Sequence, residues 1–292
     1  MRGTDRKGNE LPERGEKPER NWNSTARGAK WGGVARRAAH NATFEERGWK
    51  DADWGNAPEH DDERWERVDT AEKRRKSGRA KGPKLDLPQI DGKYLKGMTQ
   101  EQRDRLLHRI RDAAEAYLGE RFGEVDKALS PLVKRHPQIP ELQELYGLNL
   151  YRLGRWKPAI VALEASRVAT AEVDQIPALA DCHRALGNFV EVERLWDELR
   201  MAGPDAAVMV EGRIVMAGAK ADDGRLQDGI RLLEQGPVRA NRVEEHHLRL
   251  WYALADLYDR AGEHQKARRG FQRIESAEAG YLDVAERLDA LL

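Results

Sequence analysis

The sequence predicts an all-α fold: a right-handed solenoid of about five stacked helical hairpins over residues 98–292, ending in a capping helix. After Met98, apolar residues become dense and recur at i, i+3, i+4 and i+7, the pattern of amphipathic helices. Glycines separate these patterns at intervals of 31, 33, 37 and 38 residues, at Gly123, Gly154, Gly187, Gly224 and Gly262. A hairpin of this length cannot bury its apolar face alone, so successive hairpins must stack.

Residues 1–97 are predicted to form a disordered, charged tail, because a segment poor in apolar residues cannot offset the entropy cost of folding. Its charges come in blocks. Residues 20–40 hold five bases and no acid, and residues 45–72 hold eleven acids against four bases. A third block holds seven bases and no acid between residues 73 and 84: Lys73, Arg74, Arg75, Lys76, Arg79, Lys81 and Lys84.

Five of the eight tryptophans lie in this tail: Trp22, Trp31, Trp49, Trp54 and Trp65. Tryptophan is costly to expose and is favoured where a segment docks. We therefore expect these side chains to act as anchors on a partner. The alternative is incidental use of tryptophan in a solvated linker.

The clearest hairpin lies between residues 142 and 171, and it resembles the tetratricopeptide repeat, whose period is near 34 residues. The consensus places are taken by Tyr146, Gly147, Gly154, Trp156, Ala159 and Leu163. Small residues in this pattern let two antiparallel helices approach, and large residues fill the space beside them.

The other hairpins are weaker but lie in register. A degenerate first one is indicated by Ala116, Gly123, Val125, Ala128 and Leu132. Three more are marked by Ala180, Gly187, Phe189, Val192 and Trp196; by Ala217, Gly224, Leu226, Gly229 and Leu233; and by Trp251, Tyr258, Gly262, Ala267 and Phe271. The longer intervals predict longer helices or loops near 203–207 and 236–243. We predict that residues 280–292 form a last helix, which covers the exposed face of the final hairpin.

From about residue 120 the chain also resembles an uncharacterised family of actinobacterial tetratricopeptide proteins with a charged, variable N-terminal tail. The stretches that carry this resemblance are 180–187, 210–219 and 283–288. The resemblance implies a bacterial cytoplasmic protein and no assigned activity.

In such a fold the first helix of each hairpin lines a concave groove, which is the predicted binding surface. Aligning the hairpins by their glycines places there Glu141, Glu144, Tyr151, Arg152, Asp181, Arg184, Tyr252, Asp256, Asp259 and Arg260, together with Leu148, Glu211, Ile214, Val215, Asp222 and Arg249. Related domains that grip a terminal carboxylate use Lys, Arg and Asn at such positions, which are mostly acidic here. An acid-leaning groove suits a basic or mixed-charge protein or peptide. The alternative is a set of solvated helix faces.

The net charge of zero hides two unlike parts of the chain. Residues 1–98 hold 23 bases and 18 acids, and residues 99–292 hold 28 bases and 33 acids. One hypothesis is that the basic run of residues 73–84 folds back on the groove and competes with an outside partner. The alternative function is contact of this tail with RNA, through phosphate binding by Lys and Arg. No zinc-knuckle, RRM or KH signature supports that alternative.

The motifs of catalysis are missing, so an enzyme, a cofactor and a metal are not expected. The sequence contains no P-loop, no HExxH and no CxxC. Cys182 and His183 are adjacent, so on a helix they point about 100° apart and do not form a nucleophile–base pair. His246 and His247 cannot both face one metal for the same reason. The single cysteine permits no internal disulfide, no apolar run reaches the roughly 20 residues that span a bilayer, and we expect a soluble cytoplasmic protein.

Overall fold

The computed structural model describes residues 89–240 and 242–291. This part of the chain folds into eleven α-helices without a strand, after a short 3-10 helix, η2 (Gly92–Leu95). The helices form five antiparallel hairpins: α2 (Gln100–Leu118) with α3 (Phe122–Arg135), α4 (Pro140–Arg152) with α5 (Trp156–Thr170), α6 (Ile176–Ala185) with α7 (Phe189–Ala202), α8 (Ala206–Asp222) with α9 (Leu226–Glu234), and α10 (Glu245–Arg260) with α11 (His264–Ala277). α12 (Val284–Ala290) follows the last hairpin. The prediction of an all-α hairpin solenoid is confirmed.

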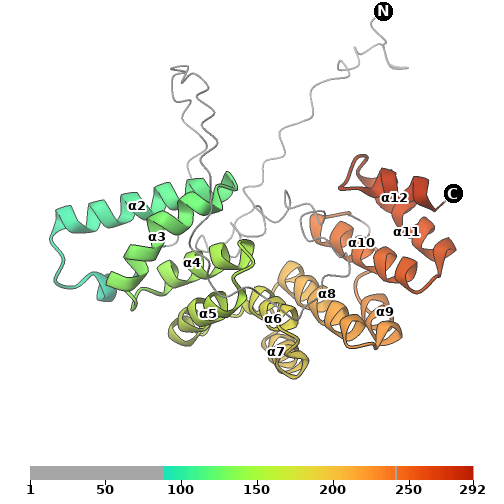
Figure 1. Ribbon diagram of the computed structural model, residues 1–292, viewed down its shortest axis with the longest axis horizontal. Coiled ribbons are helices and arrows are strands. Elements are labelled where there is room, and N and C mark those ends of the chain that lie inside the picture. The colour runs from blue at the N-terminus through green and yellow to red at the C-terminus, as the bar shows by residue number, and fades with distance from the viewer. Residues whose placement is uncertain (1–88, 241, 292) are drawn as a thin grey trace, which may run out of the picture.

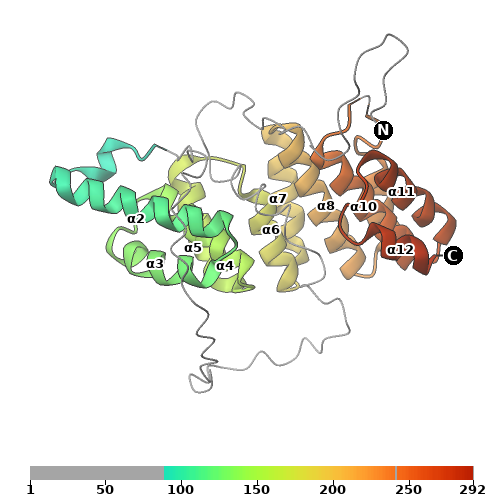
Figure 2. The ribbon, with the colours of Figure 1, turned by 90° about the horizontal axis from the view of Figure 1, so that it is seen from above.

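The hairpins stack side by side into an arc, with α2 and α12 at its raised ends (Figure 1). Seen from above, they follow one another along the long axis of the molecule (Figure 2). Even-numbered helices lie on the inside of the arc, where α6 contacts α8 and α8 contacts α10 directly. Successive odd-numbered helices make few or no such contacts in the described part of the chain. Because neighbours crowd on one side and spread on the other, the stack curves.

Local sequence signals set the ends of several helices. α2 begins with a capping box, in which the Thr99 hydroxyl accepts from the backbone N–H of Gln102 and the Gln102 side chain accepts from the backbone N–H of Thr99. The Asp205 carboxylate caps α8 by accepting from the backbone N–H of Val208. α7 ends at Ala202 and is followed by Gly203 in the left-handed conformation, just before Pro204.

A left-handed residue closes the turn of every hairpin. Gly154, Gly187, Gly224 and Gly262 take this place with φ between 70° and 76°, as the glycine spacing predicted. In the first hairpin Glu120 takes it instead, with φ 57°. The prediction that Gly123 marks this turn was therefore wrong by three residues, since Gly123 lies inside α3. A search for glycine alone misses a turn closed by another residue type.

Gly229 permits a close approach of α9 to α8. A Cβ at this position would lie 2.6 Å from the backbone oxygen of Ala217. The residue lowers helix propensity by about 1 kcal/mol relative to alanine, but any larger side chain would push the two helices apart. The close packing expected of small residues in a hairpin therefore brings the backbone of α9 near the backbone of α8.

The core runs continuously through the stack. One cluster joins α2 to α8, a second joins α8, α9 and α10, and a third joins α10, α11 and α12. Leu95, which precedes α2, belongs to the first cluster, and Ile90 packs against it. The rest of the predicted tail, with its tryptophans and its basic run, lies outside the described residues.

The last helix is shorter than predicted. α12 begins at Val284 rather than near residue 280, because Gly280 and Leu282 both have positive φ and keep the chain in turns. Tyr281 and Val284 are buried in the third cluster, so this end of the chain still covers the last hairpin. In the described residues, no helix is both long and apolar enough to cross a bilayer.

Candidate functional site on the inner face

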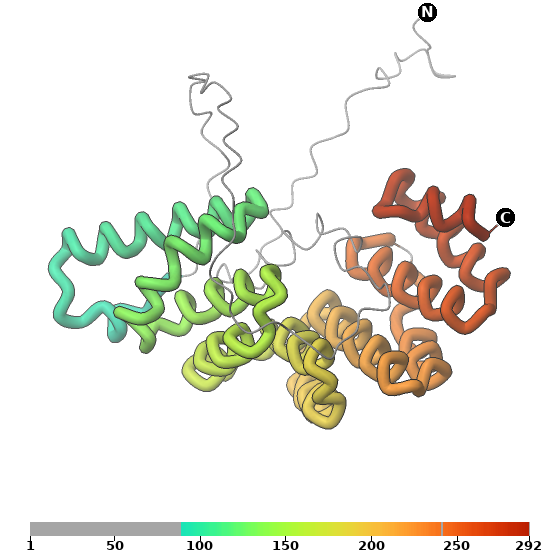
Figure 3. Tube along the Cα trace, in the orientation of Figure 1, coloured from blue at the N-terminus to red at the C-terminus, as the bar shows by residue number. Residues whose placement is uncertain are grey.

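We define the inner face as the sides of α4, α6, α8 and α10 that line the inside of the arc (Figure 3). All sixteen residues proposed for the groove lie on these helices. Ten of them are Glu141, Glu144, Tyr151 and Arg152 on α4, Asp181 and Arg184 on α6, and Tyr252, Asp256, Asp259 and Arg260 on α10, and the other six lie on α4, α8 and α10. Some of them meet in a network across the hairpins, and others lie at its edge.

The network begins at the C-terminal end of α4. The Tyr151 hydroxyl donates to Oδ2 of Asp181 on α6 at 2.7 Å. Arg184 then donates from Nη1 to Oδ1 of Asp181 at 3.1 Å and from Nε to Oδ2 of Asp222 on α8 at 2.7 Å. Oδ1 of Asp222 lies 3.7 Å from Nη2 of Arg260 on α10. One chain of polar contacts therefore joins four successive inner helices.

Further contacts continue toward the C-terminus. Arg249 on α10 lies 2.8 Å, Nε to Oε1, from Glu211 on α8. Asp256 on α10 accepts from Arg287 on α12 at 2.6 Å, and the Tyr252 hydroxyl donates to Asp283 at 2.6 Å. Asp259, another proposed groove residue, lies 3.4 Å from Arg287.

Three of these ten residues lie away from this network, and Leu148 and Val215 are buried in the first core cluster instead of lining the groove. Arg152 turns toward the first hairpin, where its guanidinium carbon stands 4.5 Å from the centre of the Phe122 ring and its Nη2 lies 3.8 Å from Glu120. Glu141 and Glu144 lie at the N-terminal end of α4, the opposite end from Tyr151. Sequence reasoning placed them on the correct helix but could not separate its two ends.

Burial shapes the electrostatics of the inner face. Burial would lower the pKa of Arg184, but Asp181 and Asp222 outweigh it and the pKa is raised. Burial raises the pKa of Asp256, and the nearby cations Arg287 and Arg260 only partly offset it. These charged groups are thus poorly hydrated, which strengthens their interactions with one another and with any charged ligand.

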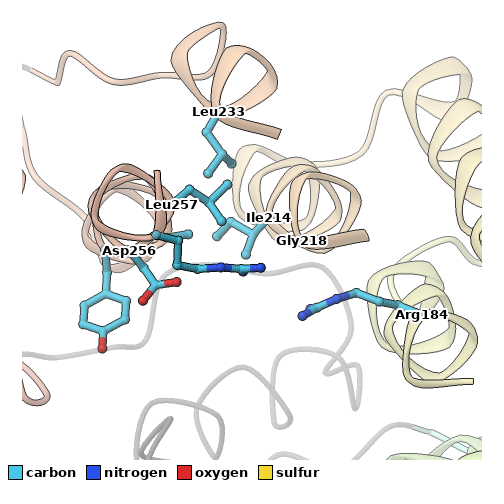
Figure 4. A pocket seen from close by; sticks show the side chains of 9 residues that line it. Arg184, Ile214, Gly218, Leu233, Asp256 and Leu257 are labelled. Atoms are coloured by element: carbon cyan, nitrogen blue, oxygen red, sulfur yellow. The ribbon is translucent and has the colours of Figure 1, made fainter. Parts of the chain in front are cut away.

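A pocket lies at the centre of the inner face, between α6, α8 and α10 (Figure 4). Arg184 extends toward it from α6, and Asp256 and Arg260 on α10 supply the other charged groups. Ile214 and Leu257 make part of its wall apolar. Gly218 leaves room for Arg184, because a Cβ there would lie 2.8 Å from the guanidinium carbon. Sequence reasoning missed Gly218, although a glycine in mid-helix was an available signal.

The cysteine and histidines raised by the sequence analysis lie apart from this pocket. Cys182 is fully buried with Leu150 and Ala159. The rings of His246 and His247 lie 4.1 Å apart, and Nδ1 of His247 accepts from the backbone N–H of Glu244. In the described part of the chain, His, Cys, Asp and Glu side chains form no group of three or more suited to hold a metal ion.

The fold was compared with those of known proteins. No family model and no curated protein matches the chain. Nine chains of solved structures do match. One is the crystal structure of a thermophilic TPR protein from Thermus thermophilus, with a TM-score of 0.51 and 17% identity over 63% of this chain and 97% of that chain. At this identity the likeness shows the fold alone, and the described part of this chain has the fold of a tetratricopeptide-repeat solenoid.

Proposed function

We propose that the chain is a protein-interaction module, an adaptor rather than an enzyme, which binds a protein or peptide segment on its inner face. The central pocket supports this proposal most directly. It combines an apolar wall with the charged groups of Arg184, Asp256 and Arg260, and it opens on a surface formed by several helices. Its volume is about 40 Å³, which is below the range of sites for whole small ligands, so it can hold only a small part of a bound segment while the surrounding helices provide the rest of the surface.

The charge of the inner face favours a basic or mixed-charge segment. Acids on α8 and α10, such as Glu211, Asp222 and Asp256, already pair with arginines across hairpins. A lysine or arginine on a ligand can share these carboxylates without leaving a buried charge unpaired, whereas an added acid would meet like charge. The ligand class proposed is therefore a peptide with basic and apolar side chains.

A pocket-filling variant tests this function. Full-length protein is used to select binders from a displayed random-peptide library, and affinities of the selected peptides are measured by calorimetry. Ala253 lines the pocket, so Ala253→Phe should weaken binding at least tenfold. Val190 on the outside of α7 is 83% exposed, so Val190→Phe serves as a matched control. Equal binding by both variants, each with an unchanged melting curve, would contradict the proposal.

The chain's own basic run is a candidate competitor for the same face, because residues 73–84 carry seven bases. We expect replacement of these seven bases by glutamine in the full chain to raise the affinity for a selected peptide. Unchanged affinity would refute the competition and leave the binding function itself untouched.

A further inference from the structure

A second candidate surface lies in the first hairpin, outside the inner face. The N-terminal half of α2 and the C-terminal end of α3 diverge (Figure 3), and a cleft of about 470 Å³ lies between them. This volume is within the range of sites that hold small ligands or single large side chains. We call it the α2–α3 cleft, and it is lined by Met98, Gln102, Arg105, Leu106, Arg109, Leu132, Arg135 and His136.

The lining combines an apolar floor with a cationic rim. Leu106 and Leu132, each only 4% exposed, form the floor. At the rim, Arg109 donates to the backbone oxygen of Ala128 at 3.4 Å. Within residues 89–240 and 242–291, neither Arg109 nor Arg135 has a carboxylate partner. These two guanidinium groups lie beside an apolar slot. A ligand that is both acidic and apolar would complement them, because its carboxylates could pair with the arginines while its apolar side chain filled the slot.

This chain contains a segment of that composition. Residues 45–72 hold eleven acids, four bases and three tryptophans, and Asp51 and Asp53 stand just before Trp54. We propose that the α2–α3 cleft is the docking site of residues 45–72, with the Trp54 indole in the apolar slot and neighbouring carboxylates against Arg109 and Arg135. Tryptophan with arginine is a frequent pairing at the centre of protein interfaces.

The connection is long enough for this contact. Trp54 is 35 residues before Gln89, where the described chain begins. A flexible chain of that length has an end-to-end distance of about 30 Å. Met98, which lines the cleft, follows nine residues later. Covalent attachment raises the effective concentration of the segment to roughly millimolar, so docking within one chain is favoured over docking from a second copy.

Photo-crosslinking in the full-length chain tests the proposal. Trp54 is replaced by the photoreactive residue p-benzoylphenylalanine, and crosslinked peptides are identified by mass spectrometry. The expected products join position 54 to residues 98–136. Products that join it to α4, α6, α8 or α10 would overturn the proposal. An equal mixture of isotopically light and heavy chains is used, and predominantly light–heavy products would overturn docking within one chain.

Charge variants sharpen the test. The double variant R109E/R135E should lower the yield of the expected crosslink at least fivefold, and so, to a smaller degree, should R109Q/R135Q. The control K127E/K134E makes the same change of charge at exposed residues of α3 that do not line the cleft. Circular dichroism checks that each variant is folded, and an equal loss in the control would overturn the assignment to the cleft.

Discussion

Polar and charged side chains on the two faces of the solenoid find their partners in different places. On the inner face, partners such as Tyr151 and Asp181 or Arg184 and Asp222 are 30 and 38 residues apart and come from different hairpins. On the outer helices, most partners are three or four residues apart in one helix, as in the ion pairs of α7, α9 and α11. Arg167 with Glu198 is an exception that joins α5 to α7.

The same residue types therefore contribute different amounts to the free energy of unfolding on the two faces. Exposed pairs within one helix contribute about 0–1 kcal/mol. Removing one partner of a buried pair costs roughly 3–5 kcal/mol, because the other charge stays buried without compensation. In a solenoid, stability is a sum of hairpin and interface contributions. The inner-face contacts therefore stabilise the interfaces between hairpins, whereas the outer pairs stabilise single helices.

The largest effect is expected from Arg184→Ala. The Arg184 and Asp181 side chains are 14% and 8% exposed, so the substitution leaves two carboxylates poorly hydrated. We expect a loss of about 3 kcal/mol in the free energy of unfolding, measured by urea denaturation. Arg231 on α9, whose side chain is 63% exposed and pairs with Asp228, is the outer-face control. Arg231→Ala should cost less than about 0.5 kcal/mol, and equal losses would erase the contrast between the faces.

A smaller effect is expected from Gly229→Ala, which tests how the two layers are held together. The new methyl group would meet the Ala217 backbone oxygen at 2.6 Å, so α9 must move away from α8 at a cost of about 1–3 kcal/mol. In Gly123→Ala, the added Cβ meets no atom within 4 Å, and we expect a gain of about 0.5–1 kcal/mol from helix propensity. Thermal melts of both variants measure these changes in stability. A stabilised Gly229→Ala protein would show that the fold does not require the close approach of α9 to α8.

The smallest effect concerns His183, which follows Asp181 on α6 but is near Glu164, Glu191 and Arg194 of the outer helices. Burial lowers the pKa of His183, against the opposing effect of the two glutamates. The unfolded chain therefore takes up this proton first, and stability should fall as pH drops below about 6.5. His183→Gln should make the urea midpoint less dependent on pH between roughly 7.5 and 5.5. An unchanged dependence would show that His183 does not contribute to it.

Much of the fold could be predicted because it rests on local signals. Amphipathic periodicity and the turn glycines at Gly154, Gly187, Gly224 and Gly262 located the later hairpins. The turn at Glu120 was not predicted, because this residue takes a left-handed conformation without being a glycine. The start of α12 was not predicted correctly, because Leu282 fits the apolar pattern of a helix but has φ 47°.

The candidate site was predicted only in part. The helices that carry it follow from the repeat, but the pairing of Arg184 with Asp222 depends on how one hairpin sits on the next. Helix α8 is longer than its neighbours, and this length brings Asp222 level with Arg184 and Arg260. The α2–α3 cleft could not be foreseen, because it results from the divergence of two helices that the periodicity treats as a close pair.

Hydrogen–deuterium exchange with a bound peptide shows which helices form the binding surface. The full chain is measured with and without a peptide selected for binding. We expect protection to rise in α4, α6, α8 and α10, whose residues form the inner face, and to stay unchanged in α5, α7 and α9. Protection confined to the outer helices, or to α2 and α3, would contradict the inner face as the binding surface.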